Sequence, residues 1–365
     1  MTTRYSSIDV LRTIAIIVMV VVHFSENLAG YTPGVAGLGA PLFVFLSGAS
    51  YFLWSDGKGA RQSSSQEVSK VSVRRGLFVF GAGIAFTVLV WLPEDVFNWD
   101  VLTFIGSALL VLNVLRCVPK SICVLVACLA VILSPVLQHI ADYPAFWEQG
   151  YFDYDWTLSD VVLGYLVAGY FPIFPWIALS IAGYLCASHL FTRDGAECDR
   201  ARASKRMALL GLSLAAASAI LVIARPMMTN VVASRFFGGW DLYPPSLEYV
   251  MGTLGMAIVL FSVLHRFLDL QPVPKSWNGP LAVAEMFSRY SLTIYVLHHI
   301  VHIWPLWMVG YSQTGEPTAF WQQALTLDWA CVLAAGFLVA CWLVFHKLGA
   351  RRIWGLEHCM RWVCD

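Results

Sequence analysis

Long apolar runs alternate with short polar segments along the whole chain. Each run approaches the roughly 20 residues that a helix needs to cross a bilayer. The pattern predicts about ten membrane-spanning helices, near residues 7–27, 36–54, 75–92, 100–116, 121–140, 159–190, 207–224, 247–267, 286–308 and 325–346. We therefore expect an all-α, polytopic helix bundle. Residues 1–365 would form one membrane-embedded domain, with its core at 7–346 and a tail at 347–365.

The sixth apolar run, 159–190, is too long for one straight span. It is interrupted at Phe171-Pro-Ile-Phe-Pro175, and proline removes a backbone donor that a helix interior needs. We expect a short half-helix or interfacial helix first, with the crossing helix beginning at about Pro175.

Composition supports the membrane assignment, because 58% of the residues are hydrophobic and only 13% are charged, against about 25% charged in soluble domains. With the N-terminus inside, only Arg225 and Arg235 of the 23 basic residues lie outside. Basic loops stay in the cytoplasm. Both termini are therefore expected to be cytoplasmic, in a multi-pass protein of the cell inner membrane. The nine cysteines show no Cys-x-x-Cys spacing, so no disulfide framework is expected.

Ionisable residues interrupt the first apolar run. These residues are Asp9, Arg12, His23 and Glu26. Their three-four spacing places them on one face of a helix. Arg12 and His23 lie about 16 Å apart along the axis. Each such group costs roughly 2.5–3.5 kcal/mol at the bilayer centre, so the stripe must face protein or a wet cavity.

The chemistry of this stripe suggests separate roles for its members. An imidazole can remove a proton from a hydroxyl or amine near neutral pH, which makes His23 a candidate base that Glu26 could orient. Arg12 could hold an anionic phosphate, with Asp9 fixing the arginine side chain. A purely structural polar contact with neighbouring spans is the alternative.

A second polar cluster occurs in the ninth span, where a four-three-four spacing places Ser291, Tyr295, His298 and His302 on one face. Histidines four apart can bind a metal, and histidines on different spans can ligate a haem. The helix offers no glutamate within the pair and no obvious third ligand. We therefore predict no metal and interpret Tyr295 and His298 as a hydrogen-bonding wall of a polar cavity.

Two further features are open to more than one interpretation. Gly39, Ser47 and Gly48 give the second span a small surface that another helix or a thin ligand can approach. The aromatic and acidic segments 142–156 and 238–245 could contact sugar rings or form an interfacial aromatic belt. No Walker motif, Rossmann fingerprint or basic nucleic-acid stripe is present, so no nucleic acid is expected as a partner.

Four blocks of sequence together resemble the transmembrane acyltransferase superfamily. They are IDVLRTIAIIVMVVVH, in which ten residues lie between Arg12 and His23, APLFVFLSG, YFPIFPWIALSIAGY and SRYSLTIYVLHH. This superfamily includes the acyltransferase-three polysaccharide O-acetyltransferases and heparan-alpha-glucosaminide N-acetyltransferase with its bacterial relatives. The second- and sixth-span blocks are more similar to the N-acetyltransferase branch.

The resemblance implies a role for each matching residue. His23 matches the histidine that acts in acyl transfer, and Arg12 the arginine paired with it. Ser47 and Gly48 match a motif that lines the acyl-donor passage, while Tyr295 and His298 match a late polar pair. Thr13 departs from the glycine or alanine that usually follows the arginine.

These observations predict an acetyl-CoA-dependent O- or N-acetyltransferase that modifies a sugar or glycan outside the cytoplasm. His23 would be the general base, assisted by Glu26 or His298. Arg12, Asp9, Ser47, Gly48 and Tyr295 would contact acyl-CoA. The partners expected are membrane lipid, acyl-CoA and the glycan, with a homo-oligomer or a separate periplasmic acceptor protein left open. A secondary transporter of a polar solute and a bis-histidine haem protein are the alternatives.

Overall fold

A computed structural model describes residues 4–59, 64–91, 96–148, 151–191, 197–229, 236–349 and 355–365. The chain forms two compact units. Unit 1 consists mainly of Pro41–Pro272, and unit 2 of Tyr5–Ala40 with Val273–Val363. The first helix of the chain therefore belongs to the same unit as the last ones. The prediction of a single domain over 1–365 stays a prediction.

Unit 1 is built from pairs of contacting helices. Polar side chains at several helix starts accept from free backbone N–H groups: Ser64 from Glu67, Asp100 from Leu102, and Ser246 from Tyr249. The pairs are α3 (Ser65–Val90) with α4 (Val101–Leu115), α5 (Lys120–Ile140) with α7 (Ile173–Leu190), and α8 (Glu197–Ala224) with α10 (Leu247–Leu264).

Helix α2 (Ala36–Gly59) crosses α7 with almost no side chain between the two backbones. A Cβ atom added to Gly48 would lie 1.8 Å from the Ser180 carbonyl oxygen, and one added to Gly183 would lie 1.9 Å from that of Phe45. Only glycine can occupy these two positions at this separation. The small surface predicted for the second span is thus used for helix packing.

The sixth apolar run is broken as the prolines predict. Helix α6 (Leu158–Leu163) continues as the π-helical segment η3 (Gly164–Ala168), and α7 begins at Ile173 after a non-helical stretch. The indole N–H of Trp147 donates to the Ala168 carbonyl oxygen at 2.8 Å, which satisfies one of the carbonyls left free where the helix ends.

Aromatic residues of segment 142–156 pack mainly against one another. Trp99, Tyr143, Phe146 and Phe152 form a buried cluster with Ala168. The 3-10 helix η2 (Tyr143–Phe146) precedes a two-stranded antiparallel hairpin, β1 (Trp147–Glu148) and β2 (Tyr151–Phe152). Much of the segment is therefore a structural cluster, although Trp156 remains 60% exposed.

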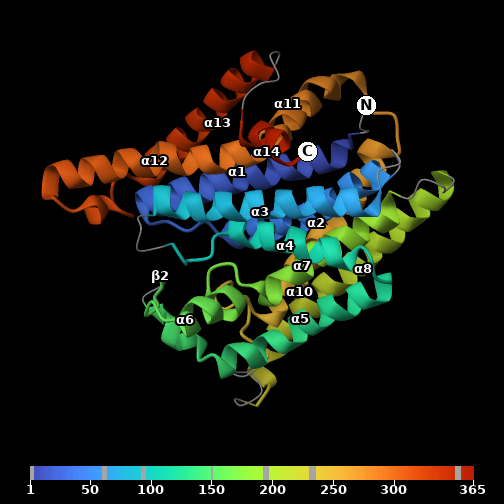
Figure 1. Ribbon diagram of the computed structural model, residues 1–365, viewed down its shortest axis with the longest axis horizontal. Coiled ribbons are helices and arrows are strands. Elements are labelled where there is room, and N and C mark those ends of the chain that lie inside the picture. The colour runs from blue at the N-terminus through green and yellow to red at the C-terminus, as the bar shows by residue number, and fades with distance from the viewer. Residues whose placement is uncertain are drawn as a thin grey trace. The chain divides into compact units, whose positions relative to one another are not determined.

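Unit 2 combines the N-terminal helix with the C-terminal ones. Helix α1 (Ser6–Ala29) contacts three of them: α11 (Asn278–Arg289), α12 (Ser291–Thr314) and α13 (Leu327–Gly349). Figure 1 shows α1 in blue lying beside α12 in orange. The Thr13 hydroxyl lies 2.8 Å from the Asp9 carbonyl and 3.0 Å from that of Ala284, so the residue that departs from the family pattern joins α1 to α11.

The terminal helix α14 (Leu356–Cys364) caps the start of α12. Glu357 accepts from the backbone N–H of Leu292 at 2.6 Å and of Thr293 at 3.1 Å, and from the Thr293 hydroxyl at 2.5 Å. The first N–H groups of a helix have no partner within it. The C-terminal segment thus supplies a cap that α12 lacks locally.

Nine helices among the described residues are long and apolar enough to cross a membrane. The fourth predicted run, 100–116, is the one outside these nine, because it forms α4, which has only 15 residues. The all-α, polytopic bundle expected from the sequence is confirmed.

Basic residues gather where one helix of a pair ends and its partner begins. Arg116 donates to the Ser65 carbonyl, Lys120 to that of Ser188 and Arg266 to that of Ala201. This grouping agrees with the charge pattern, while the cytoplasmic placement of that side stays a prediction. Five residues of the charge argument lie outside the described part of the chain: Arg61, Arg193, Arg235, Arg351 and Arg352.

Candidate functional site

Two histidines from opposite ends of the chain meet in unit 2. The Nδ1 atom of His23, on α1, lies 2.8 Å from the Nε2 atom of His298, on α12. Their rings are nearly parallel, at 13° with centroids 5.1 Å apart. His298 is fully buried, whereas His23 is only partly buried. The structure therefore brings together the two histidines that the sequence identified on separate spans.

Two more histidines of α12 extend this pair. The His299 ring centroid lies 4.5 Å from that of His23 and 4.1 Å from that of His298. His302 follows one turn later, with its centroid 5.4 Å from that of His299. His299 and His302 are both buried. We call these four residues, His23, His298, His299 and His302, the histidine cluster.

Backbone contacts determine which nitrogen of the central pair carries a proton. The Nδ1 atom of His298 lies 3.2 Å from the Ile294 carbonyl oxygen. A carbonyl can only accept, so Nδ1 carries the hydrogen and Nε2 of the neutral ring has a lone pair. That lone pair must accept from Nδ1–H of His23. The Nε2 atom of His23 is then the unprotonated nitrogen.

His302 is held by a separate set of hydrogen bonds. Its Nδ1–H donates to the His298 carbonyl at 2.5 Å, and its Nε2 accepts from the Asn27 amide at 3.0 Å. The Asn27 amide oxygen accepts in turn from the Trp321 indole at 3.3 Å. Both ring nitrogens of His302 are engaged, which suits a structural role better than proton transfer.

The other predicted residues near the cluster have defined contacts. Tyr295 is buried with its ring edge-on to His298, at a centroid distance of 5.6 Å. Glu26 accepts from the Thr32 hydroxyl at 3.4 Å, and no contact with His23 is seen among the described residues. Orientation of the His23 ring therefore comes from His298.

Arg12 lies at the other end of the stripe on α1. Its Nη1 donates to the Ser288 hydroxyl at 2.9 Å and to the Ser288 carbonyl at 3.3 Å, which joins α1 to the last turn of α11. Asp9 is buried in the first turn of α1, where the helix dipole favours a negative charge. These contacts show how Arg12 is anchored, and its contact with acyl-CoA stays a prediction.

Ser47 and Gly48 belong to unit 1 and face α7. The Ser47 hydroxyl donates to the Val44 carbonyl at 2.7 Å and lies 3.2 Å from the Ser180 hydroxyl. Together with the close approach at Gly48, these bonds give both residues a packing role. Their part in an acyl-donor passage stays a prediction.

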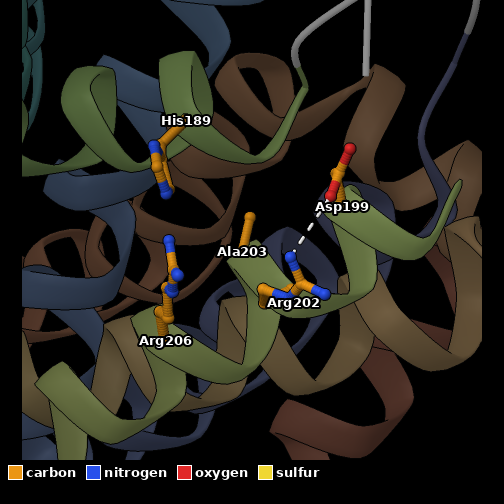
Figure 2. A pocket seen from close by; sticks show the side chains of 5 residues that line it. All are labelled: His189, Asp199, Arg202, Ala203 and Arg206. Carbon is orange, nitrogen blue, oxygen red and sulfur yellow. Dashed lines mark ion pairs between the residues drawn. The ribbon is translucent and has the colours of Figure 1, made fainter. Parts of the chain in front are cut away.

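A basic pocket lies between the end of α7 and the start of α8 in unit 1. It encloses about 280 Å³ and is lined by His189, Asp199, Arg202, Ala203 and Arg206. Figure 2 shows His189 and Arg206 pointing toward one another across it, and Asp199 paired with Arg202 at 3.6 Å. With two arginines and one carboxylate, the lining can attract a phosphate group.

Sequence reasoning missed three contributors to the site. Asn27 follows His23 by one helical turn, so its position on the stripe was a usable signal. His299 lies off the face shared by Tyr295, His298 and His302, and Ser288 precedes α12; nothing in the periodicity singled out either residue.

A comparison with protein-family models identifies the family of the chain. The family model for the heparan-alpha-glucosaminide N-acetyltransferase catalytic domain matches residues 4–223, more than half of the chain. The match includes the stripe on α1, whereas Tyr295 and the three histidines of α12 lie beyond its end. A search of curated proteins finds no matching relative.

Proposed function

Because this chain belongs to the heparan-alpha-glucosaminide N-acetyltransferase catalytic family, we propose that it transfers an acetyl group from cytosolic acyl-CoA to a sugar outside the cytoplasm. A membrane acetyltransferase needs a base that lies within its helices and can reach an acceptor hydroxyl or amine. The hydrogen-bonded pair of His23 and His298 is the observation that supports this proposal.

In the proposed step, Nε2 of His23 removes the proton of the acceptor O–H or N–H as that atom attacks the thioester carbonyl. A new C–O or C–N bond forms and the C–S bond breaks. The sulfur leaves as a thiolate and takes the proton from the His23 imidazolium, which yields CoA thiol and restores the neutral base. His23 takes one proton from the acceptor and gives one proton to the CoA sulfur, so the cycle needs no other reactant.

His298 acts through His23 as a positioning residue. By accepting from Nδ1–H, it keeps the His23 ring in the tautomer whose Nε2 is basic, and it fixes the plane of that ring. Its own Nδ1–H is held by the Ile294 carbonyl. The orientation of the base is thus determined by the backbone of α12.

The donor phosphates would be bound by basic residues on the predicted cytoplasmic side. The pocket with Arg202 and Arg206 is one candidate, and its volume of about 280 Å³ suits one end of a larger ligand. Arg12 is the other, because its guanidinium can bind an anion in addition to Ser288. Membrane lipid and a glycan acceptor complete the proposed partners; no metal is required for this reaction.

Replacing His23 tests the proposal. Purified His23→Ala protein should lose acyl transfer to an amino sugar or polysaccharide acceptor, because the base is removed. Met19→Ala, one turn earlier on the same stripe, is the matched control and should keep it. Stabilisation by acetyl-CoA in a thermal melt would show that both variants are folded and bind donor. Turnover retained by folded His23→Ala protein would overturn the assignment.

A further inference from the structure

The histidine cluster contains more imidazole groups than the proposed reaction uses. His299 has no part in that reaction, yet one ring nitrogen from each of His23, His298 and His299 lies within 4.8 Å of the others. Three imidazoles gathered around one point match the ligand set of open zinc sites, which keep a fourth position for water. The sequence argument against a metal rested on the lack of a glutamate within the pair and of a third ligand, and His299 with His23 removes the second objection.

We propose that His23, His298 and His299 form a binding site for a divalent transition metal ion of the zinc class, and that an ion bound there stops acyl transfer. The inhibition rests on the function proposed above, whereas the binding does not.

The surroundings of His298 favour coordination. Its Nδ1–H already donates to the Ile294 carbonyl, and metal-binding histidines generally donate their other ring N–H to a carbonyl or carboxylate, which fixes the ligand nitrogen. Nε2 of His298 is therefore the ligand nitrogen, and an ion would take its lone pair in place of the hydrogen bond from Nδ1–H of His23. Zn–N bonds measure about 2.0–2.1 Å, so closing the three rings on an ion takes movements on the order of 1 Å.

Coordination and catalysis compete for the same electrons on His23. If the ion binds Nδ1, the ring proton must move to Nε2 and the basic lone pair is lost. If the ion binds Nε2, that lone pair is used directly. Either way His23 cannot accept a proton from the acceptor, so an occupied site is an inactive one.

The chemistry of the ligands limits which ions can bind. Imidazole nitrogen suits Zn²⁺, Co²⁺, Ni²⁺ and Cu²⁺, whereas Mg²⁺ and Ca²⁺ prefer oxygen. All three ligands are neutral, so a water or an anion at the fourth position would have to help balance the ion's charge. His23 is the partly exposed member of the set, so we expect the ion to enter from its side.

Co²⁺ is the probe for binding, because its visible absorption intensifies when it becomes four-coordinate. Full-length purified protein should show this spectrum with Co²⁺, lose it on addition of Zn²⁺, and keep it with excess Mg²⁺. His299→Ala should abolish it. His302→Ala is the matched control, because His302 lies next to the set but its nitrogens bond to Asn27 and His298. Equal spectra from the His299→Ala variant and the parent protein would overturn the site.

Inhibition is measured as the rate of acyl transfer in the presence of Zn²⁺, and each variant is compared with its own metal-free rate. We expect a chelator to reverse the inhibition. Half-inhibition of His299→Ala protein should need at least about tenfold more Zn²⁺ than that of the parent protein, in line with the effect of losing a ligand-shell group. Turnover that survives in a Co²⁺-loaded site, or that requires added Zn²⁺, would overturn the inhibition. If His23→Ala keeps its turnover, the base assignment fails, while the Co²⁺ spectrum still tests the site.

Discussion

The Nδ1 of His23 and the Nε2 of His298 are 2.8 Å apart although 275 positions separate them in the chain. Because the other nitrogen of His298 is committed to a backbone carbonyl, this contact also determines the tautomer of His23. A single hydrogen bond thus selects which atom can act as a base. The consequences can be tested by changing either partner.

We expect His298→Gln and His298→Leu to behave differently. The glutamine side-chain oxygen can still accept from Nδ1–H of His23, whereas leucine cannot. His298→Leu should lower kcat by about a hundredfold, as misplacement of a reacting group does, with the KM for acetyl-CoA little changed. His298→Gln should recover part of that loss. Equal kcat values for the two variants would show that His298 does not act through this bond.

The contact between Arg12 and Ser288 separates two roles of the arginine. Arg12→Ala should lower the melting temperature, since hydrogen bonds to a charged group contribute about 1.5–3 kcal/mol, and should also raise the KM for acetyl-CoA. Ser288→Ala removes the 2.9 Å hydroxyl contact but keeps the carbonyl. It should cause a smaller loss of stability and no change in KM. An unchanged KM in folded Arg12→Ala protein would leave Arg12 with a structural role alone.

Substitutions at the crossing of α2 and α7 should be costly. A methyl group at Gly48 or Gly183 would collide with a carbonyl oxygen of the opposite helix, and overpacking of this kind typically costs about 1–3 kcal/mol. Gly48→Ala and Gly183→Ala should each lower the melting temperature. Gly81→Ala in α3, where a Cβ meets nothing within 4 Å, is the control and should be neutral or slightly stabilising. A similar melting temperature for all three would contradict the close approach.

The Glu357 cap predicts a pH-dependent stability. Burial raises the pKa of this carboxyl above its ordinary value of 4.5, although its hydrogen bonds oppose the shift. A carboxyl whose pKa is raised on folding stabilises the fold fully below its ordinary pKa, and this contribution is lost as the pH rises through the folded-state value. As the pH rises above about 4.5, the melting temperature of the parent protein should therefore fall. The melting temperature of Glu357→Gln protein should fall by less over the same pH range.

Glutamine at position 357 keeps an acceptor oxygen for the backbone of α12 but does not titrate, so the comparison isolates the charge. Glu67 in the first turn of α3 gives a matched control, because Glu67→Gln removes a carboxylate at a helix start that is exposed. Parallel pH profiles for the parent and Glu357→Gln proteins would show that the cap does not titrate in this range.

The helices themselves could be predicted from the sequence to a large extent. Apolar runs and the prolines near residues 171–175 were sufficient to place the spans and the break before α7. Their lengths were less certain, because α4 ends after 15 residues. Such boundaries depend on caps such as Asp100 and on packing against α3, which a hydropathy pattern does not contain.

The site was predictable only in part. Ionisable groups within apolar runs are conspicuous, so His23 and His298 could be identified singly. Their contact could not, because many apolar helix faces are similar and periodicity does not say which ones pair. His299 was missed for a related reason: it follows His298 by about 100° around α12, and only the position of His23 beside both rings brings it into the cluster.

The membership of α1 in unit 2 has a consequence for biosynthesis. Ribosomes deliver the chain from the N-terminus, so α1 enters the membrane long before α11, α12 and α13 exist. During that interval Arg12 lacks Ser288 and His23 lacks His298, and the nascent helix must hold these polar groups in lipid or shield them by temporary contacts. Truncation before Ser288 would remove both of these contacts permanently, which is the kind of defect that membrane quality-control proteases recognise.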